Sequence, residues 1–137
     1  RVKSVRVVAA LIADRQDQKR LLVQQRLATK SRANLWEFPG GKVEPGESDA
    51  AALRRECQEE RGVVLLVGEK LWSTVHAYTD LTVELVLYRG TIISGEPKPL
   101  GAQALRYCTP EQMRGLPFCE ADLPLIEALL AGRAAWQ

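Results

Sequence analysis

The chain has 137 residues, of which 46% are hydrophobic and 26% are charged. This mixture is typical of a globular protein and excludes a disordered chain, and the length is sufficient for a hydrophobic core without support from disulfides or zinc. With 19 basic and 17 acidic residues the net charge is +2, which excludes the strong basic excess of a dedicated nucleic-acid-binding protein. We therefore expect one domain over residues 1–137 that binds no nucleic acid.

The segment before the first predicted helix contains two predicted strands and two predicted loops. Residues 5–13 form a short apolar, β-branched run, which predicts a buried strand, and residues 21–23 predict a second strand that forms a hairpin with the first. Residues 29–34 are basic and polar, which is typical of a loop. Residues 36–46 are rich in glycine and proline, so we expect no regular structure there.

Residues 49–61 consist mostly of strong helix formers and predict a helix. Ser48 is expected to cap its N-terminus, where the negative charge of Asp49 is also favourable. Gly62 follows the last helical residue and is a good C-terminal stop. The sequence therefore predicts one well-defined helix in the middle of the chain.

The second half of the chain predicts mainly strands. Residues 63–67 and 71–75 are apolar and β-branched and predict two strands, while residues 81–88 alternate between apolar and polar side chains, as a half-buried strand does. Residues 95–101 contain two prolines and predict a loop, and residues 104–108 predict a short strand.

Two helical segments are expected near the C-terminus. Residues 110–114 predict one helical turn, and residues 122–134 predict a helix with Asp122 as its N-cap. Strands that are followed by a helix, further strands and a final helix favour a mixed α/β (α+β) sandwich over a doubly wound parallel sheet.

The three cysteines, Cys57, Cys108 and Cys119, include no CxxC pair, so we expect neither a zinc site nor dithiol chemistry. Reduced thiols of this kind are typical of the cytoplasm, which is the localisation we expect. No apolar run approaches the roughly 18 residues of a membrane span, and we expect no membrane partner. Residues 1–4 lead directly into a strand-like segment, so no signal peptide is expected there.

Three glutamates of the predicted helix, Glu56, Glu59 and Glu60, share one face because they are spaced i, i+3 and i+4. Alone, this pattern is more typical of a solvated acidic surface. However, the glycine-rich residues 40–47 lead directly into the helix, and such a loop lets backbone carbonyls approach the carboxylates. Mg²⁺ prefers oxygen ligands and usually combines few carboxylates with substrate phosphates and water. The sequence therefore predicts a metal–phosphate site, and it contains no P-loop motif.

Residues 41–63, GKVEPGESDAAALRRECQEERGV, resemble the signature of the Nudix hydrolases. Cys57 is the one slightly unusual member, and it acts as a small hydrophobe. Residues 22–26, 35–44 and 121–126 are similar to the MutT-like branch of this family. The resemblance implies a Nudix-type α/β/α sandwich with a mixed β-sheet. The matched signature positions are Gly41, Glu47, Arg55, Glu56, Cys57, Glu59, Glu60, Gly62 and Val63.

The resemblance also implies an activity and a metal site. The expected reaction is the Mg²⁺-dependent or Mn²⁺-dependent hydrolysis of a nucleoside triphosphate to the monophosphate and pyrophosphate. The implied metal ligands are the carbonyl of Gly40 and the carboxylates of Glu56 and Glu60, with Glu59 beside them. Arg55 is expected to orient these carboxylates, with Glu47 in a similar supporting role.

The chain departs from the family at two positions. Many relatives place a glutamate two residues before a glutamine in the later loop, as a further metal ligand or base, but here Gly101 precedes Gln103. The general base is then expected to be Glu59 or Glu56, while Glu96 is a remote substitute. Leu81 stands where some relatives carry an arginine that contacts the base or phosphate, which weakens any transfer of substrate specificity.

Four further residues are expected to bind the substrate: Arg26, Phe38, Lys42 and Asp122. Arg26 matches a position that contacts the phosphate or sugar of a nucleotide, although a surface arginine at a strand end is an equal alternative. Phe38 is expected to stack on a base or to pack in the core, as is Trp36, and Lys42 either contacts phosphate or stays solvated. The single histidine, His76, is expected to be structural or to face solvent.

Asp122 stands where the branch that acts on oxidised guanine is expected to have an asparagine. An ionised carboxylate only accepts hydrogen bonds and favours an amino-bearing edge, such as that of cytosine or adenine. A buried, protonated Asp122 would instead mimic the amide and read oxidised guanine. Its expected role as a helix cap is compatible with either form of base contact.

Several functions remain open from the sequence. An 8-oxo-dGTP hydrolase and a cytidine-type hydrolase that includes modified dCTP are both compatible with nucleotide-pool sanitation. Tyr78, 16 residues after Gly62, is the one feature that favours a dinucleoside-polyphosphate hydrolase. A non-catalytic nucleotide-binding module typically loses the signature glutamates, which this chain keeps. The expected partner is a small nucleotide, and the expected assembly is a monomer or a homodimer.

Overall fold

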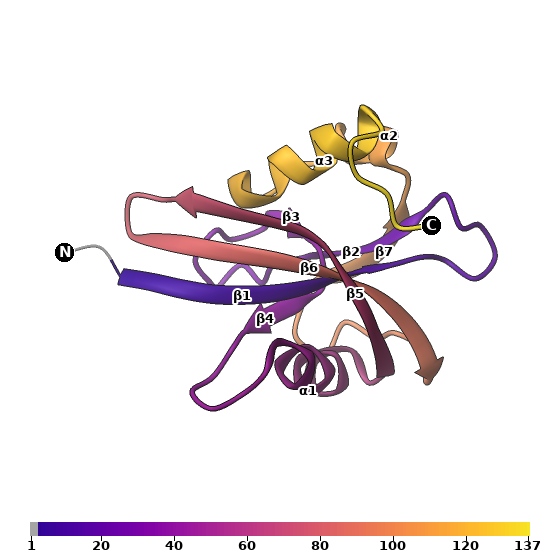
Figure 1. Ribbon diagram of the computed structural model, residues 1–137, viewed down its shortest axis with the longest axis horizontal. Helices are drawn as coiled ribbons and strands as arrows, with labels where there is room; N and C mark the ends of the chain where they lie inside the picture. Colours follow the sequence, from indigo (N-terminus) through magenta and orange to yellow (C-terminus); the bar gives the residue numbers. More distant parts are fainter. Residues whose placement is uncertain (1–2) are drawn as a thin grey trace.

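The computed structural model describes residues 3–137 and contains two β-sheets with helices on both sides (Figure 1). Residues 1 and 2 lie outside the described residues. They are the first residues of the predicted domain and of the segment in which we expect no signal peptide. The elements in chain order are β1 (Lys3–Ile12), β2 (Leu21–Gln25), β3 (Trp36–Glu37), β4 (Gly40–Lys42), α1 (Asp49–Arg61), β5 (Val64–Ala77), β6 (Leu81–Ser94), β7 (Ala104–Cys108), α2 (Pro110–Met113), the 3₁₀ turn Glu120–Asp122 and α3 (Leu123–Leu130).

The larger sheet is mixed and has four strands in the order β4-β1-β6-β5. β1 and β6 run parallel, whereas β1 pairs with β4 and β5 pairs with β6 in antiparallel fashion. The smaller sheet has three antiparallel strands in the order β3-β2-β7. α1 covers one side of the sheets, and α2 and α3 cover the other (Figure 1). The predicted α/β/α sandwich with a mixed sheet is therefore confirmed.

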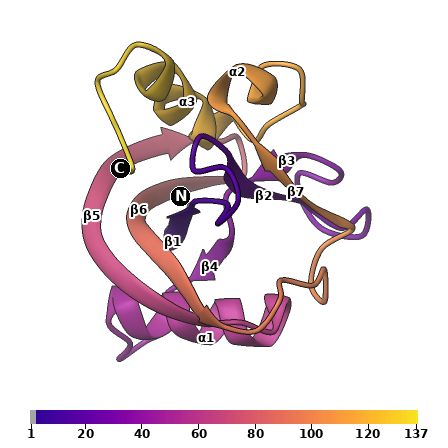
Figure 2. The same ribbon diagram turned by 90° about the vertical axis from the view of Figure 1, so that its right-hand side faces the viewer.

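β5 and β6 form a hairpin of two strands with 14 residues each, and it curves from the level of α3 to that of α1 (Figure 2). The two strands predicted at residues 63–67 and 71–75 are in fact the single strand β5. The prediction was wrong because register shifts between Val67 and Lys70, and between Lys70 and Trp72, interrupt the alternation without ending the pairing. Such β-bulges bend a strand and increase its twist.

Two predictions about the first half of the chain were wrong. β1 and β2 do not form a hairpin: they belong to different sheets and are joined by one antiparallel bridge, Ala13 to Leu21. The last five residues of β1 are buried on both faces, as is typical of a strand in the middle of a sheet. β1 accordingly lies between β6 and β4, one on each edge. Residues 36–46 are not wholly irregular either, since they contain the short strands β3 and β4.

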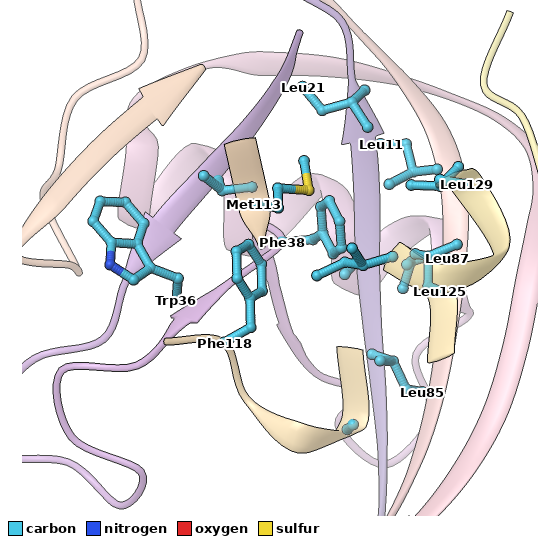
Figure 3. Close-up of a cluster of buried hydrophobic side chains, with 14 of the residues drawn as sticks. Leu11, Leu21, Trp36, Phe38, Leu85, Leu87, Met113, Phe118, Leu125 and Leu129 are labelled. Atoms are coloured by element: carbon cyan, nitrogen blue, oxygen red, sulfur yellow. The ribbon is translucent and has the colours of Figure 1, made fainter. Parts of the chain in front are cut away.

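Alternating residues of β1 belong to two separate hydrophobic cores. Ala9 and Leu11 pack into the core beneath α2 and α3, where Phe38, Leu87 and Leu125 also lie (Figure 3). Val8 and Ala10 point the opposite way, into the core beneath α1. This two-residue period is that of any β-strand, and here it lets one strand support both layers of helices.

All three cysteines are free and buried. Burial raises the pKa of the Cys57 thiol to about 11, and the pKa of the Cys119 thiol is raised to about 12 by the same cause. A thiol with a raised pKa is a poor nucleophile and metal ligand at neutral pH. The cysteines therefore act as small apolar side chains in these cores.

α1 begins and ends where the sequence predicts. The Ser48 hydroxyl accepts a hydrogen bond from the Ala51 N–H over 3.1 Å, and Gly62 ends the helix in the left-handed region with φ of 70°. Asp49 anchors the first turn to the sheet by accepting hydrogen bonds from the Arg6 guanidinium (2.8 and 2.6 Å) and from the Tyr88 hydroxyl (2.6 Å). The N-terminus of α1 is thus tied to both β1 and β6.

The C-terminal helix is shorter than expected. α3 ends at Leu130 rather than at residue 134, and a 3₁₀ turn precedes it. Asp122 occupies the predicted N-cap position of α3, but it has helical backbone angles and its side chain makes no capping hydrogen bond. Pro124 in the first turn needs no such partner because it has no N–H to cap. Within residues 3–137, none of the helices combines the length and apolarity that crossing a lipid bilayer demands.

The cap of α1 gives a direct test of this local structure. Ser48→Ala removes the acceptor for the Ala51 N–H and should lower the free energy of unfolding by about 1 kcal/mol, measured by urea denaturation. Ser48→Asp keeps an acceptor and serves as the matched control, which should lose much less. Equal destabilisation by both variants would show that the hydroxyl does not act as a cap.

Candidate active site

A cavity of about 470 Å³ lies between the two sheets and extends to α1. Its walls come from β1 and β6 of the larger sheet, from the segment between β2 and β4, and from the turn before α3. Seven of the residues predicted to bind metal or substrate line this one cavity: Arg26, Phe38, Gly40, Lys42, Glu56, Glu60 and Asp122. The fold thus brings together residues that are far apart in the sequence.

Glu56 and Glu60 form an acidic pair at the α1 end of the cavity. Glu56 is the more enclosed of the two, with a side chain that is 14% exposed, against 34% for Glu60. Burial and the adjacent Glu60 carboxylate raise the pKa of Glu56 above its ordinary value, while the Arg55 guanidinium opposes the shift. Two neighbouring carboxylates in a partly buried site favour either a shared proton or a bound cation.

The donors present fit a hard divalent cation that is also held by its substrate. No group of three His, Cys, Asp or Glu side chains in the described chain is arranged as a complete metal site. The available donors are the carboxylates of Glu56 and Glu60 and the carbonyl of Gly40, all facing the same cavity. Mg²⁺ commonly uses one or two carboxylates and completes its octahedron with water and phosphate oxygens. The donor set therefore suits Mg²⁺ or Mn²⁺.

Two glycines make room for the acidic pair. A Cβ on Gly41 would lie 2.2 Å from the Glu56 carboxyl carbon, and a Cβ on Gly101 would lie 2.6 Å from Glu60 Oε1. Gly101 is the position where relatives are expected to carry a further glutamate. In this chain the space beside that position is occupied by Glu60 itself, so a side chain there would have to displace the Glu60 carboxylate.

Arg55 connects the glycine-rich loop to the acidic pair. Its guanidinium donates two hydrogen bonds to Glu47 (2.7 and 2.8 Å) and one to Glu56 (3.0 Å). Glu47 also accepts a hydrogen bond from the Glu44 N–H over 2.9 Å, which fixes the turn before the helix. The predicted orienting roles of Arg55 and Glu47 match this arrangement. Glu59 lies outside the cavity lining with a 56% exposed side chain, and its Oε1 is 3.6 Å from Arg55 Nη1.

Arg61 is a site feature that the sequence did not predict. An arginine at the end of a helix usually faces solvent, yet the Arg61 side chain is completely buried. Its guanidinium donates to Gln24 Oε1 from Nε over 2.8 Å and also from Nη2, and to the Glu56 carbonyl over 3.1 Å. Gln24 itself is 3% exposed and lines the cavity. Neither the residues around Gln24 nor those around Arg61 predict this contact, because the two residues come from distant segments of the chain.

Asp122 lies at the opposite end of the cavity and is 4% exposed. Burial, and then the negative charge of Glu37, raise the pKa of Asp122 well above its ordinary value, while the Arg26 guanidinium opposes the shift. Glu37 is held by Arg26 over 3.1 Å and by the side-chain amide of Gln24 over 2.7 Å. Phe38 lines the same cavity and also packs against Phe118, with 5.9 Å between ring centroids. This end combines apolar and paired charged side chains with one buried carboxyl group.

Arg32, which the sequence did not single out, and Tyr78, which it did, flank the Asp122 end. The Arg32 guanidinium lies 4.3 Å from the centre of the Tyr78 ring and donates to Asp80 over 3.1 Å. All three residues line the cavity, so this cluster joins the loop after β2 to the β5–β6 turn. The Tyr78 hydroxyl accepts a hydrogen bond from the Ala121 N–H over 3.0 Å, which gives this tyrosine a packing role.

Three other residues singled out in the sequence lie away from the cavity. His76 is 3.1 Å from a Glu120 carboxylate oxygen and is not part of the lining, in line with its predicted structural role. Trp36 is 8% exposed and packs in the core, which favours packing over base stacking. Glu96 lines a different cavity near the C-terminus, so the geometry does not support it as a substitute base.

Comparison with known proteins identifies the family. The model of the NUDIX domain matches residues 8–128. The chain belongs to the Nudix family. It is 40% identical to the CTP pyrophosphohydrolase of Escherichia coli K12, over 98% of this chain and 97% of that protein, and 31% identical to the 8-oxo-dGTP diphosphatase of Haemophilus influenzae, over 93% of each.

The comparison with solved structures agrees with this assignment. The solution structure of the E. coli ORF135 protein has a TM-score of 0.78 and 38% identity, with 96% of this chain and 92% of that chain covered. The predicted resemblance to the MutT-like Nudix enzymes is thereby confirmed, and the chain is a Nudix hydrolase with the mixed fold of that family.

The Glu47–Arg55 contact predicts a pH dependence of stability. The Arg55 guanidinium, and then the Glu44 N–H, lower the pKa of Glu47 from 4.5 to about 2. Both partners favour the ionised form in the folded state. The resulting stabilisation is therefore complete above pH 4.5 and is lost as the pH falls towards 2.

Glu47→Gln removes the titrating group and should be less stable than the wild type at about pH 6, where both are compared by urea denaturation. The difference between the two proteins should shrink as the pH falls below about 4.5. Circular dichroism at neutral pH controls for the helix content. A difference that is constant down to the lowest pH would contradict the role of the Glu47 charge.

Proposed function

We propose that this Nudix hydrolase cleaves a nucleoside triphosphate, natural or modified, to the monophosphate and pyrophosphate in the presence of Mg²⁺, with Mn²⁺ as a substitute. The observation that carries the proposal is the single cavity with an acidic pair at one end and a buried carboxyl group at the other. Its volume of about 470 Å³ lies within the range of small-molecule sites. The first end suits a metal-bridged phosphate chain, and the second suits a base.

Glu56, Glu60 and the Gly40 carbonyl would hold the metal ion, which would neutralise phosphate oxygens and supply an activated water. Lys42 lies beside these groups and is exposed, so its charge is available to the phosphates. Arg26 lines the middle of the cavity but already pairs with Glu37. We assign the general base to Glu59, because Glu56 and Glu60 would hold the metal, while the exposed Glu59 carboxylate lies outside the cavity lining and contacts the same Arg55 nitrogen as Glu56.

Asp122 is the proposed contact to the base. When ionised it accepts a hydrogen bond from the amino group of cytosine, and when protonated it also donates to an oxygen such as those of oxidised guanine. A cytidine-type triphosphate, including modified dCTP, is the first candidate because the relative named CTP pyrophosphohydrolase matches nearly the whole chain at 40% identity. The burial of Asp122 supports 8-oxo-dGTP as a second candidate, since burial favours the protonated form.

A panel of triphosphates tests the proposed reaction. Purified protein with Mg²⁺ should release pyrophosphate from CTP, 5-methyl-dCTP or 8-oxo-dGTP, and EDTA should abolish the release because no protein group replaces the metal. Chromatography of the products distinguishes pyrophosphate from single phosphate. Binding of a nucleotide without any turnover would instead establish a non-catalytic module.

Glu59→Gln tests the general base. The amide cannot accept a proton, so the turnover number should fall by about 100-fold or more, while circular dichroism shows an intact helix. Glu127→Gln, which alters an exposed glutamate of α3 (side chain 60% exposed), is the matched control and should keep full activity. Unchanged turnover in Glu59→Gln would exclude this role.

Asp122→Asn tests base selection. The amide donates and accepts at every pH, so the ratio of kcat/KM for 8-oxo-dGTP to that for CTP should rise by about tenfold or more. In the wild type the ratio should fall as the pH rises, because deprotonation of Asp122 removes the donor. In Asp122→Asn this ratio of kcat/KM values should be nearly independent of pH. Identical ratios in the two proteins would remove Asp122 from base recognition.

A further inference from the structure

Arg61 places a permanent positive charge inside the protein, directly behind the acidic pair. Its side chain is 0% exposed, and an arginine guanidinium keeps its proton in proteins. Nη2 lies 3.4 Å from the Gly40 carbonyl oxygen and 3.9 Å from Glu60 Oε1. These two oxygens are the donors assigned above to the metal ion.

The hydrogen bonds of the Arg61 guanidinium go to neutral groups, and the carboxylate oxygen Glu60 Oε1 lies 3.9 Å from Nη2, beyond hydrogen-bond distance. These hydrogen bonds, as far as the described residues show, go to the Gln24 amide oxygen and to the carbonyls of Glu56 and Gly40. Arg55, by contrast, contacts carboxylate oxygens at 2.7 to 3.0 Å. A buried charge that no hydrogen-bonded carboxylate neutralises acts over several ångströms, because little water screens it.

Gln24 fixes the orientation that this arrangement requires. Its side-chain amide nitrogen donates to Glu37 over 2.7 Å, so its oxygen is left facing Arg61. The guanidinium is therefore held in one position, with Nη2 directed towards Gly40 and Glu60. A structural role alone would need only the contacts with Gln24 and with the Glu56 carbonyl.

We propose that Arg61 is a built-in cation that keeps the metal affinity of the free enzyme low, so that the metal ion binds mainly together with the nucleotide phosphates. The inference rests on the proposed function for the metal-binding role of Gly40 and Glu60. The guanidinium repels a divalent cation, attracts the Glu60 carboxylate and donates a hydrogen bond to the Gly40 carbonyl oxygen. The negative charge of a bound triphosphate reverses this balance, which couples metal binding to substrate binding. Arg61 is thus a positioning residue that acts through Gly40 and Glu60.

Mn²⁺ binding to the free protein, followed by electron paramagnetic resonance at neutral pH, tests the proposal without any catalytic step. The double variant Gln24→Leu/Arg61→Leu replaces the buried polar pair by apolar side chains of suitable size, an exchange that proteins often tolerate. It should bind Mn²⁺ about tenfold or more tightly than the wild type. Addition of α,β-methylene-CTP should tighten Mn²⁺ binding strongly in the wild type and much less in the double variant.

Two controls separate charge from shape. Arg54→Leu removes an exposed positive charge from the same helix and should change the Mn²⁺ affinity by less than about twofold. Arg61→Lys keeps the buried charge and should bind Mn²⁺ as weakly as the wild type. If the double variant does not fold, Arg61→Met serves in its place.

Unchanged or weaker Mn²⁺ binding in a folded variant that lacks the Arg61 charge would overturn the proposal, as would tighter binding in Arg61→Lys. The pyrophosphate assay is read separately. A wild type that hydrolyses no triphosphate would refute the proposed function, while the direction of the change in Mn²⁺ affinity would still decide the role of Arg61.

Discussion

The close approach of two carboxylates, Glu56 and Glu60, is the constraint on which the rest of the site depends. Their proximity on one face of α1 is unfavourable by itself, and partial burial makes it more so. Two arginines reduce this electrostatic repulsion between the carboxylates. Arg55 contacts Glu56 from the solvent side over 3.0 Å, and the buried charge of Arg61 approaches Glu60 from the core over 3.9 Å. The helix itself is held to the sheet by Asp49, through Arg6 and Tyr88.

The strand β1 links this helix to the cavity. Its residues Val8 and Ala10 pack under α1, whereas Val7 and Ala9 face the cavity, so one strand both supports the acidic pair and forms part of the opposite wall. The parallel pairing of β1 with β6 adds Val83 and Leu85 to that wall. The curved β5–β6 hairpin then brings its turn to the Asp122 end (Figure 2). The larger sheet thus sets the separation between the Glu56–Glu60 end and the Asp122 end of the cavity.

The sequence predicted those parts of the molecule that are local along the chain. The α1 helix, its cap and its glutamates all lie in one contiguous segment, so their spacing could be read directly. The strands that pair with β1 could not be predicted in this way. The apolar pattern of β1 indicates a buried strand but does not specify its neighbours, and the predicted hairpin with β2 was wrong. Arg61 was missed because its burial depends on Gln24, which lies 37 residues away. Asp122 stands at the predicted N-cap position, but its side chain does not cap the helix, and the residue lines the cavity, which only the folded structure shows.

Glu56 and Asp122 show how one chemical cause can prepare two different interactions. Burial raises the pKa of both carboxyl groups, and a neighbouring glutamate adds to the shift in each case, Glu60 for the first and Glu37 for the second. At the α1 end Glu60 and Gly40 supply further oxygen donors, so a divalent cation can relieve the repulsion. At the other end Glu37 is already paired with Arg26, and Asp80 with Arg32. There the energy is lowered by a proton on Asp122 or by a donor from the bound base. The same residue type therefore suits a metal ion at one end of the cavity and a nucleobase at the other.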